Sequence, residues 1–301
     1  MKLPTLVLRR YSRFVLVAVI GAFWGSEWII TRGIDLPLQS LAIRQAFAAV
    51  LLLAVSILQR RAMPDGRLLL LSAISGATAL SIPAILIVYA SERISPGLLI
   101  LVLAMTPLIA ALVEGRARGT LLGALTGGIA GTALLVSQAL SFSAAQWLGG
   151  VAALASATLV AGSLVLIKRR LLSIGPVAMS AIQFCASALL LWIVSLATEG
   201  PVSVSLTSRE WVATISLAMV GSAIAWPVYC VALRDLEPFQ LSSSQWVGTL
   251  TGLVEGFAVV RGEISWRTIS GAAILVLNLA GAWRARDEED EAVTILITPS
   301  T

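Results

Sequence analysis

The sequence predicts an all-α membrane protein with ten transmembrane helices, arranged as two inverted five-helix repeats. Of its 301 residues, 58% are hydrophobic and 12% are charged, whereas a soluble domain carries about 25% charged residues. Ten apolar stretches are each long enough to cross a bilayer. The sequence Leu-Val-Glu-Gly occurs at Leu112–Gly115 and again at Leu253–Gly256. An odd number of crossings turns the second copy upside down, as in many transporters.

Apolar runs bounded by charged residues, proline or glycine predict the individual helices. The ranges are 13–32, 37–59, 68–90, 95–114, 119–139, 145–167, 176–197, 210–233, 238–260 and 266–284. About 20 residues for each helix leave about 10 for each connection, which is too few for a soluble catalytic domain. The basic start before Phe14 resembles a secretory signal. We interpret it as a retained first helix, because the apolar run is long and no clear cleavage site follows.

The distribution of basic residues predicts which side of the membrane each connection faces. With a cytoplasmic N-terminus, 15 Lys and Arg residues lie inside and five lie outside. Short cytoplasmic loops hold the positive charge in membrane proteins, so both termini are predicted to be cytoplasmic. An uncharged connection around Phe142 divides the chain into repeats at 13–141 and 142–284. Residues 285–301 form an acidic tail that we expect to be disordered.

Composition also excludes several classes of function. The chain contains no histidine, so the commonest metal ligand and proton shuttle is absent. We therefore expect no metal site and no cofactor. Cys185 and Cys230 fall within apolar runs, where small buried side chains are expected. The net charge of +5 follows the sides of the membrane and forms no single patch, so no nucleic-acid partner is expected.

Several short motifs occur in a fixed order along the chain. They are Trp24-Gly25-Ser26-Glu27-Trp28, Arg44 in the second helix, Ser95-Pro96-Gly97, Thr106-Pro107-Leu108, Gly123, and Arg261-Gly262-Glu263-Ile264-Ser265 followed by Gly271. With them the chain resembles the bacterial EamA-type members of the drug/metabolite transporter superfamily, over about residues 13–284. The resemblance implies a secondary transporter of the bacterial inner membrane. Glu27 departs from the family pattern, which usually has an amide-like residue at this position.

Three ionisable residues lie inside predicted helices, namely Glu27, Arg44 and Glu255. Each is expected about 7–10 Å from the outer end of its helix. Such residues are functional candidates, because an unpaired charge inside a bilayer is costly. One interpretation is a buried structural ion pair between Arg44 and either carboxylate. The other is that the remaining carboxylate binds a proton, a cation or a substrate amine. Glu114 is expected near the cytoplasmic surface, paired with Arg116 or Arg118.

Uncharged and aromatic side chains could complete a binding site. The candidates are Gln183, Gln245, Trp246, Trp24, Trp28, Tyr89 and Tyr229. Gln183 is the repeat mate of Arg44, and a deep indole could stack on a flat or cationic substrate. For each of them, packing against a neighbouring helix is the alternative. Trp147, Trp211, Trp266 and Trp283 fall at helix ends and are expected to anchor at the membrane interface.

Prolines and glycines predict where helices bend or approach closely. Pro83, Pro107 and Pro227 interrupt the third, fourth and eighth helices, which makes them gating candidates. The alternative is that they serve helix packing alone, as prolines in membrane helices often do. Glycines at four-residue spacing form a stripe from Gly119 to Gly131 on the fifth helix. Such a stripe permits close helix contact, within the bundle or with a second copy. In similar proteins the fifth and tenth helices lie together at the periphery. Monomer and homodimer both stay open.

The sequence therefore favours a secondary transporter that moves a small organic solute by alternating access between its two halves. Export of an amino acid or related metabolite is favoured by analogy with similar proteins, and proton coupling is an open option. The expected partners are the solute, protons and the lipid bilayer. The alternatives are efflux of organic cations or drugs and a passive channel or facilitator. A membrane-embedded enzyme is disfavoured, because no catalytic motif is evident.

Overall fold

The computed structural model describes residues 3–31, 37–60, 64–138, 140, 146–201, 207–260 and 265–297. Side chains are described within 12–27, 38–60, 64–138, 140, 146–201, 207–255 and 265–285. Every regular element in these residues is helical. Segments labelled η are π-helical turns within longer helices.

The first half of the chain contains α1 (Leu3–Thr31), α2 (Pro37–Leu58), α3 (Gly66–Gly76), η1 (Ala77–Ser81), α4 (Ile82–Ser91), α5 (Pro96–Leu103), α6 (Thr106–Glu114) and α7 (Gly119–Leu135). The second half contains α8 (Trp147–Leu166), η3 (Ile167–Leu171), α9 (Pro176–Thr198), α10 (Ser208–Ser216), η4 (Leu217–Ile224), α11 (Ala225–Ala232), α12 (Pro238–Ser242), α13 (Ser244–Val260) and α14 (Trp266–Ile297). These bounds lie within four residues of the predicted ranges, except at the start of α1 and the end of α14.

Seven helical stretches in the described part of the chain are long and apolar enough to cross a membrane. They are Leu38–Leu58, Gly66–Ser91, Pro96–Glu114, Trp147–Leu171, Pro176–Thr198, Ser208–Ala232 and Trp266–Ala285. The apolar helix α7 is shorter, at 17 residues. The chain is thus a multi-pass membrane protein. The count of ten spans and the inverted relation of the two halves stay predictions.

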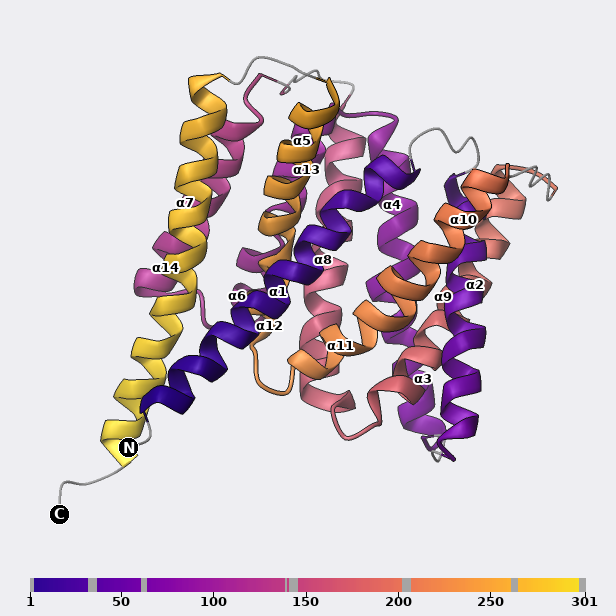
Figure 1. Ribbon diagram of the computed structural model, residues 1–301, viewed down its shortest axis with the longest axis horizontal. Coiled ribbons are helices and arrows are strands. Elements are labelled where there is room, and N and C mark those ends of the chain that lie inside the picture. The colour runs from indigo at the N-terminus through magenta and orange to yellow at the C-terminus, as the bar shows by residue number, and fades with distance from the viewer. Residues whose placement is uncertain are drawn as a thin grey trace.

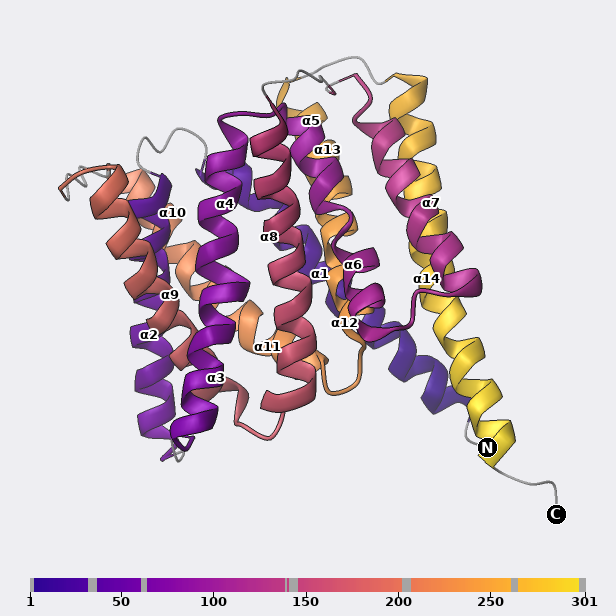
Figure 2. The same ribbon diagram turned by 180° about the vertical axis from the view of Figure 1, so that it is seen from behind.

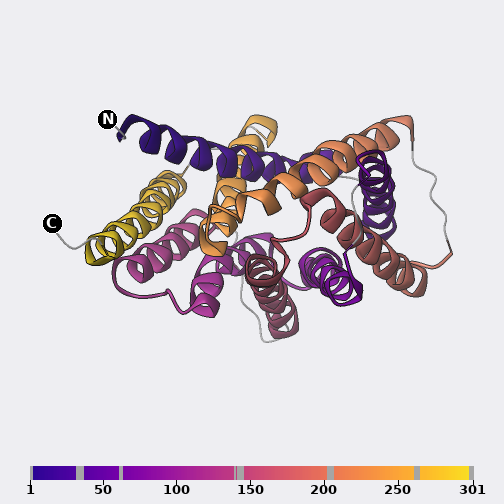
Figure 3. The same cartoon turned by 90° about the horizontal axis from the view of Figure 1, so that it is seen from below.

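The helices pair between the two halves of the chain. α2 packs along α9, α7 along α14, and α1 along α13, while α8 contacts α4, α5 and α6. The α7–α14 pair lies at one end of the molecule and the α2–α9 pair at the other (Figure 1). Figure 2 shows α4 and α8 side by side between these ends. The view from below shows α1 lying along one face of the molecule (Figure 3). The start of α1 and the end of α14 lie at the same end of the bundle (Figure 1).

The three prolines that predicted helix interruptions do mark breaks. Pro83 and Pro107 are the second residues of α4 and α6, and Pro227 is the third residue of α11. A π-helical segment precedes α4 and α11, and a turn precedes α6. Because proline has no N–H, the carbonyl four residues earlier loses its helix partner. Thr106 compensates at one break, since its hydroxyl donates to the Leu103 carbonyl at 2.6 Å.

Glycines allow two pairs of helices to touch backbone to backbone. A Cβ on Gly25 of α1 would lie 2.7 Å from the Gly248 Cα of α13. On α7, a Cβ on Gly131 would lie 2.8 Å from the Leu275 backbone nitrogen of α14, whereas a Cβ on Gly127 would meet the Asn278 side chain. Gly123, one turn earlier on the same stripe, faces open space. The glycine stripe therefore serves contacts within the chain over part of its length, and α7 and α14 lie together as the resemblance implied.

Three observations differ from the sequence expectations. α1 begins at Leu3, so the basic start is helical and continuous with the first apolar run. α14 continues to Ile297, so most of the acidic tail is helical where disorder was expected. Its Glu, Ala and Arg residues favour helix and extend the preceding one. Trp283 is buried, contacts Phe14 edge to face, and donates to the Ser243 hydroxyl at 3.2 Å, so it is not an interfacial anchor.

Candidate functional site

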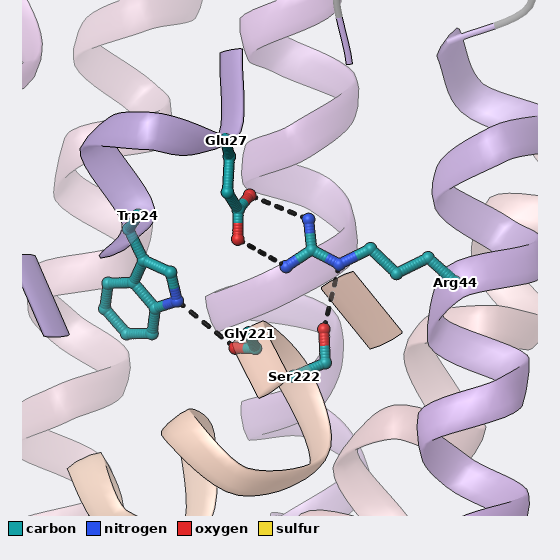
Figure 4. Close-up of polar contacts among 5 residues, drawn as sticks. All are labelled: Trp24, Glu27, Arg44, Gly221 and Ser222. Atoms are coloured by element: carbon teal, nitrogen blue, oxygen red, sulfur yellow. Dashed lines mark hydrogen bonds and ion pairs between the residues drawn. The ribbon is translucent and has the colours of Figure 1, made fainter. Parts of the chain in front are cut away.

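An ion pair between Glu27 of α1 and Arg44 of α2 forms the centre of the site (Figure 4). Arg44 Nη1 and Nη2 each donate to one Glu27 carboxylate oxygen at 2.7 Å. Arg44 Nε donates to the Ser222 hydroxyl of η4 at 2.9 Å. The side chains of Arg44 and Glu27 are 13% and 23% exposed. This bidentate geometry is the strong form of the arginine–carboxylate interaction, and it joins three helices at one point.

The π-helical segment η4 supplies the other wall of this site. Trp24 of α1 donates its indole N–H to the Gly221 carbonyl at 3.2 Å (Figure 4). A Cβ on Gly221 would come within 2.7 Å of the Phe23 ring and 3.0 Å of Glu27 Oε1. Only glycine therefore allows η4 to approach the ion pair this closely. π-helical turns are rare and are found frequently at functional sites.

Glu255 of α13 lies on the other side of α1 and has no cationic partner among the described residues. Its Oε1 lies 2.5 Å from the Ser26 hydroxyl. Its Oε2 is buried and has no hydrogen-bond partner in the part of the chain that the structure describes. The structure thus resolves which carboxylate pairs with Arg44. Glu27 is neutralised by the guanidinium, and Glu255 is held by one hydroxyl.

Gln183 of α9 lies in a separate buried network. Its amide nitrogen donates to the Ser75 hydroxyl at 2.9 Å, and its amide oxygen accepts from the Trp226 indole at 2.8 Å. Trp226 stacks on Tyr229 with ring centroids 5.6 Å apart, and the Trp24 ring lies 4.9 Å from the Tyr229 ring. Trp24 therefore connects this aromatic cluster to the ion-pair site through its indole N–H.

The other candidates lie elsewhere. Trp246 is fully buried, packs on Gly128 and donates to the Ala104 carbonyl at 2.9 Å. Its neighbour Gln245 is exposed. The Arg93 guanidinium carbon lies over the Tyr89 ring, 3.6 Å from the ring centroid. The side chain of Trp28 lies outside the described residues.

A second charged cluster lies at the end of the bundle that holds the N-terminus. Lys168 Nζ is 3.5 Å from Glu237 Oε2 and donates to the Leu236 carbonyl at 2.7 Å. Arg116 Nη2 is 3.8 Å from Glu237 Oε1. The Glu114 carboxyl group also contacts Glu237. We expected Arg116 to pair with Glu114. In the structure, Arg116 forms its ion pair with Glu237 instead.

Three residues of the site were not singled out from the sequence, namely Ser222, Gly221 and Ser26. Ser222 and Gly221 lie almost 180 residues from Arg44 along the chain, in an apolar run with no local signal. Ser26 stands inside the Trp24–Trp28 motif, so its position next to Glu27 could have drawn attention to it. A hydroxyl in an apolar helix usually bonds its own backbone, which hides such a role.

The site offers two distinct chemical environments. One is the Glu27–Arg44 ion pair, whose arginine also bonds the Ser222 hydroxyl and which lies beside Trp24. The other is the Glu255 carboxyl group, which has no countercharge within the described ranges and is suited to bind a proton or an ammonium group. No group of three or more His, Cys, Asp and Glu side chains in the described residues is arranged to hold a metal ion.

Comparisons with known proteins agree with this architecture. The family model described as the EamA-like transporter family matches residues 147–283. A chain in a solved crystal structure is similar with a TM-score of 0.77 and 18% sequence identity, covering 90% of this chain and 98% of that chain. At that identity the likeness shows the fold alone. None of the curated proteins matches the sequence.

Proposed function

Residues 147–283 belong to the EamA-like transporter family, part of the drug/metabolite transporter superfamily, and on this premise we propose that the chain exports a small organic solute by proton-coupled alternating access. The proposed cargo is an amino acid or a related amine-bearing metabolite. We place the protein in the bacterial inner membrane with both termini in the cytoplasm, because fifteen basic residues lie on the side of the termini against five on the other.

The observation that carries this proposal is the contrast between the two carboxylates. Glu27 is bonded by both terminal nitrogens of Arg44, whereas the polar partner of Glu255 among the described residues is one hydroxyl. A carboxylate held inside a membrane protein without a cation is costly unless it binds a proton or a cationic ligand. We therefore assign coupling or amine binding to Glu255 and a bracing role to the Glu27–Arg44 pair.

The state of Arg44 also bears on the class of cargo. Each of its three guanidinium nitrogens donates to Glu27 or Ser222. Among the described residues of the site, Arg44 is the cation and its charge is compensated by Glu27, so strongly anionic solutes fit poorly. An ammonium group suits Glu255. The same feature supports efflux of organic cations as the second candidate function, and size and shape of the tested solutes would separate the two.

Alternating access requires segments that move between two states. The breaks before Pro83, Pro107 and Pro227 divide three helices into separate segments. We propose that these breaks let the outer and inner ends move separately. The pairing of α1 with α13, and of α8 with α5 and α6, supports two structurally related halves that pack across one another.

Counterflow in proteoliposomes tests the proposal directly. Vesicles with purified protein are loaded with unlabelled amino acids or amines, and uptake of the labelled compound is followed with and without a pH gradient. Uptake that depends on the loaded solute and responds to pH supports a proton-coupled carrier. Movement that neither saturates nor shows counterflow would indicate a channel or passive facilitator instead.

Two variants sharpen this test. Glu255→Gln is expected to abolish the pH response while leaving folded protein, since the amide cannot take up the proton. Glu27→Gln is expected to weaken transport mainly through the loss of its bonds to Arg44. If Glu255→Gln moved solute at the original rate with an unchanged pH profile, the coupling role of Glu255 would be wrong.

A further inference from the structure

The hydroxyl of Ser26 contacts two oxygen atoms at once. It lies 2.5 Å from Glu255 Oε1 and 2.9 Å from the Ala22 carbonyl, one turn earlier in α1. A serine hydroxyl has one proton to donate, and a backbone carbonyl can only accept. One proton shared between two acceptors makes two weak bonds, whereas both contacts are full hydrogen bonds when Glu255 is protonated and donates to Ser26. When Glu255 is ionised, the Ser26 hydroxyl donates its hydrogen bond to the carboxylate instead of to the Ala22 carbonyl.

From this count of protons we propose that Ser26 is a positioning residue, which holds Glu255 in both protonation states and thereby sets the pH range of transport. The inference rests on the proposed role of Glu255. Protonation reverses the direction of the Ser26–Glu255 bond and leaves its two partners in place. The carboxyl group therefore keeps Ser26 as its partner in both protonation states while α1 and α13 are packed together.

The surroundings of Glu255 agree with a group that spends part of the cycle neutral. Its buried Oε2 has no partner, which costs less for the carbonyl oxygen of a neutral acid than for half of a carboxylate. The charged side chains that the structure describes on the elements packed against α13 are engaged elsewhere or distant. Glu27 bonds Arg44, Arg13 pairs with Asp235, and Glu237 pairs with Lys168. Arg267 lies over the Trp266 ring, and Arg284 follows Trp266, the first residue of α14, by 18 residues.

The packing of α1 against α13 makes this contact sensitive to helix movement. Gly25, next to Ser26, lies against the backbone of Gly248, so the two helices touch directly. The serine side chain is short, and its bond to Glu255 survives only while the helices stay this close. Protonation of Glu255 is therefore tied to the α1–α13 contact, one of the contacts between the two halves of the chain.

The test compares four variants in counterflow measured across a range of pH. Ser26→Ala is expected to move the midpoint of the pH profile to higher pH, by about tenfold in proton concentration, because the ionised carboxylate loses the hydroxyl that donates to it. Ser26→Thr keeps the hydroxyl and is expected to restore the original midpoint. Thr251→Val is the matched control on α13, since the Thr251 hydroxyl bonds only the Val247 carbonyl of its own helix. Glu255→Gln is expected to remove the pH response altogether.

Infrared spectroscopy of the purified protein gives a second measurement that needs no transport. The carbonyl band of protonated Glu255 is identified by its absence in Glu255→Gln. In Ser26→Ala this band is expected to shift in frequency and to titrate at higher pH. If Ser26→Ala does not give folded protein, Ser26→Cys, a weaker donor, is expected to show the same changes in smaller measure.

The outcomes separate the two proposals. An unchanged pH midpoint and an unchanged band in Ser26→Ala, with the pH response lost in Glu255→Gln, would overturn the role of Ser26 and leave that of Glu255 standing. A normal pH response in Glu255→Gln, with no missing band, would overturn both.

Discussion

The positive charge of Arg44 is compensated by Glu27, which limits how strongly Arg44 can bind an anionic substrate. Its three guanidinium nitrogens bond Glu27 and Ser222. Removing one partner of such a pair leaves the other charge without compensation, which costs more than replacing both. The pair therefore acts as a brace among α1, α2 and η4.

Replacing Arg44 alone is expected to harm the fold as well as transport. We expect Arg44→Ala to lower the free energy of unfolding by about 1–3 kcal/mol, because Glu27 loses both donors. The change is measured as a lower Tm in detergent. The double variant Glu27→Gln with Arg44→Gln is expected to be less destabilised than Arg44→Ala, and an equal or larger loss would contradict a bracing role.

Gly221 is the residue whose small size the site requires most directly. Gly221→Ala is expected to weaken transport and lower Tm, since its Cβ would press on the Phe23 ring and on Glu27. Gly162→Ala in α8 is the control, because a Cβ there has open space around it. Equal effects of the two substitutions would show that the approach of η4 is not as tight as described.

At the scale of the helices, the interruptions supply polar groups that an intact helix would conceal. The turn between α5 and α6 leaves the Ala104 carbonyl free to accept from the Trp246 indole of α13. The π-helical η4 presents the Gly221 carbonyl to Trp24 in the same manner. Two tryptophans are thus fixed by breaks in neighbouring helices, one in the first half of the chain and one in the second.

These two tryptophans are expected to respond differently to substitution. Trp246→Phe loses one buried hydrogen bond and is expected to cost about 1 kcal/mol of stability with no change in the range of solutes moved. Trp24→Phe is expected to alter transport, because Trp24 lies between the ion pair and the aromatic cluster. Tm and counterflow over the same solute panel measure both. A changed solute range in Trp246→Phe would place that residue in the binding site after all.

At the scale of the whole molecule, a charged cluster joins the two halves of the chain at the end that holds the N-terminus. Glu114 and Arg116 come from the first half, and Lys168 and Glu237 come from the second. Glu237 also caps the start of α12. Charges shared across halves at one end must separate if that end opens.

Neutralising Glu237 is expected to loosen this end. In Glu237→Gln both Lys168 and Arg116 lose their carboxylate, so the end is expected to open more often. Cys230, buried in α11, reports this opening as faster labelling by a maleimide, measured in a Cys185→Ala background. Arg118→Gln, which removes a nearby charge outside the Glu237 pairs, is the control. No change in the labelling rate of Glu237→Gln would argue against a closing role for the cluster.

Much of the helix framework could be predicted from the sequence, because the apolar runs and their proline and glycine boundaries are local signals. The predicted starts match the residues at which α2, α7, α9, α12 and α14 begin. The extent of α1 and α14 was underestimated, because charged residues that end an apolar run do not end a helix. The three ionisable candidates were also evident, since a charge inside an apolar run stands out.

The sequence by itself determined that this protein is helical, lies in a membrane and carries Glu27, Arg44 and Glu255 inside its helices. Only the tertiary structure decided that Arg44 bonds Glu27, that Ser222 and Gly221 complete this contact, and that Glu255 depends on Ser26. Trp246 and Trp283 likewise became structural residues only in three dimensions. The physical reason is that hydropathy and helix breaking are properties of neighbouring residues, whereas partners are chosen by packing between helices far apart in the chain, where glycines fix how closely two backbones approach.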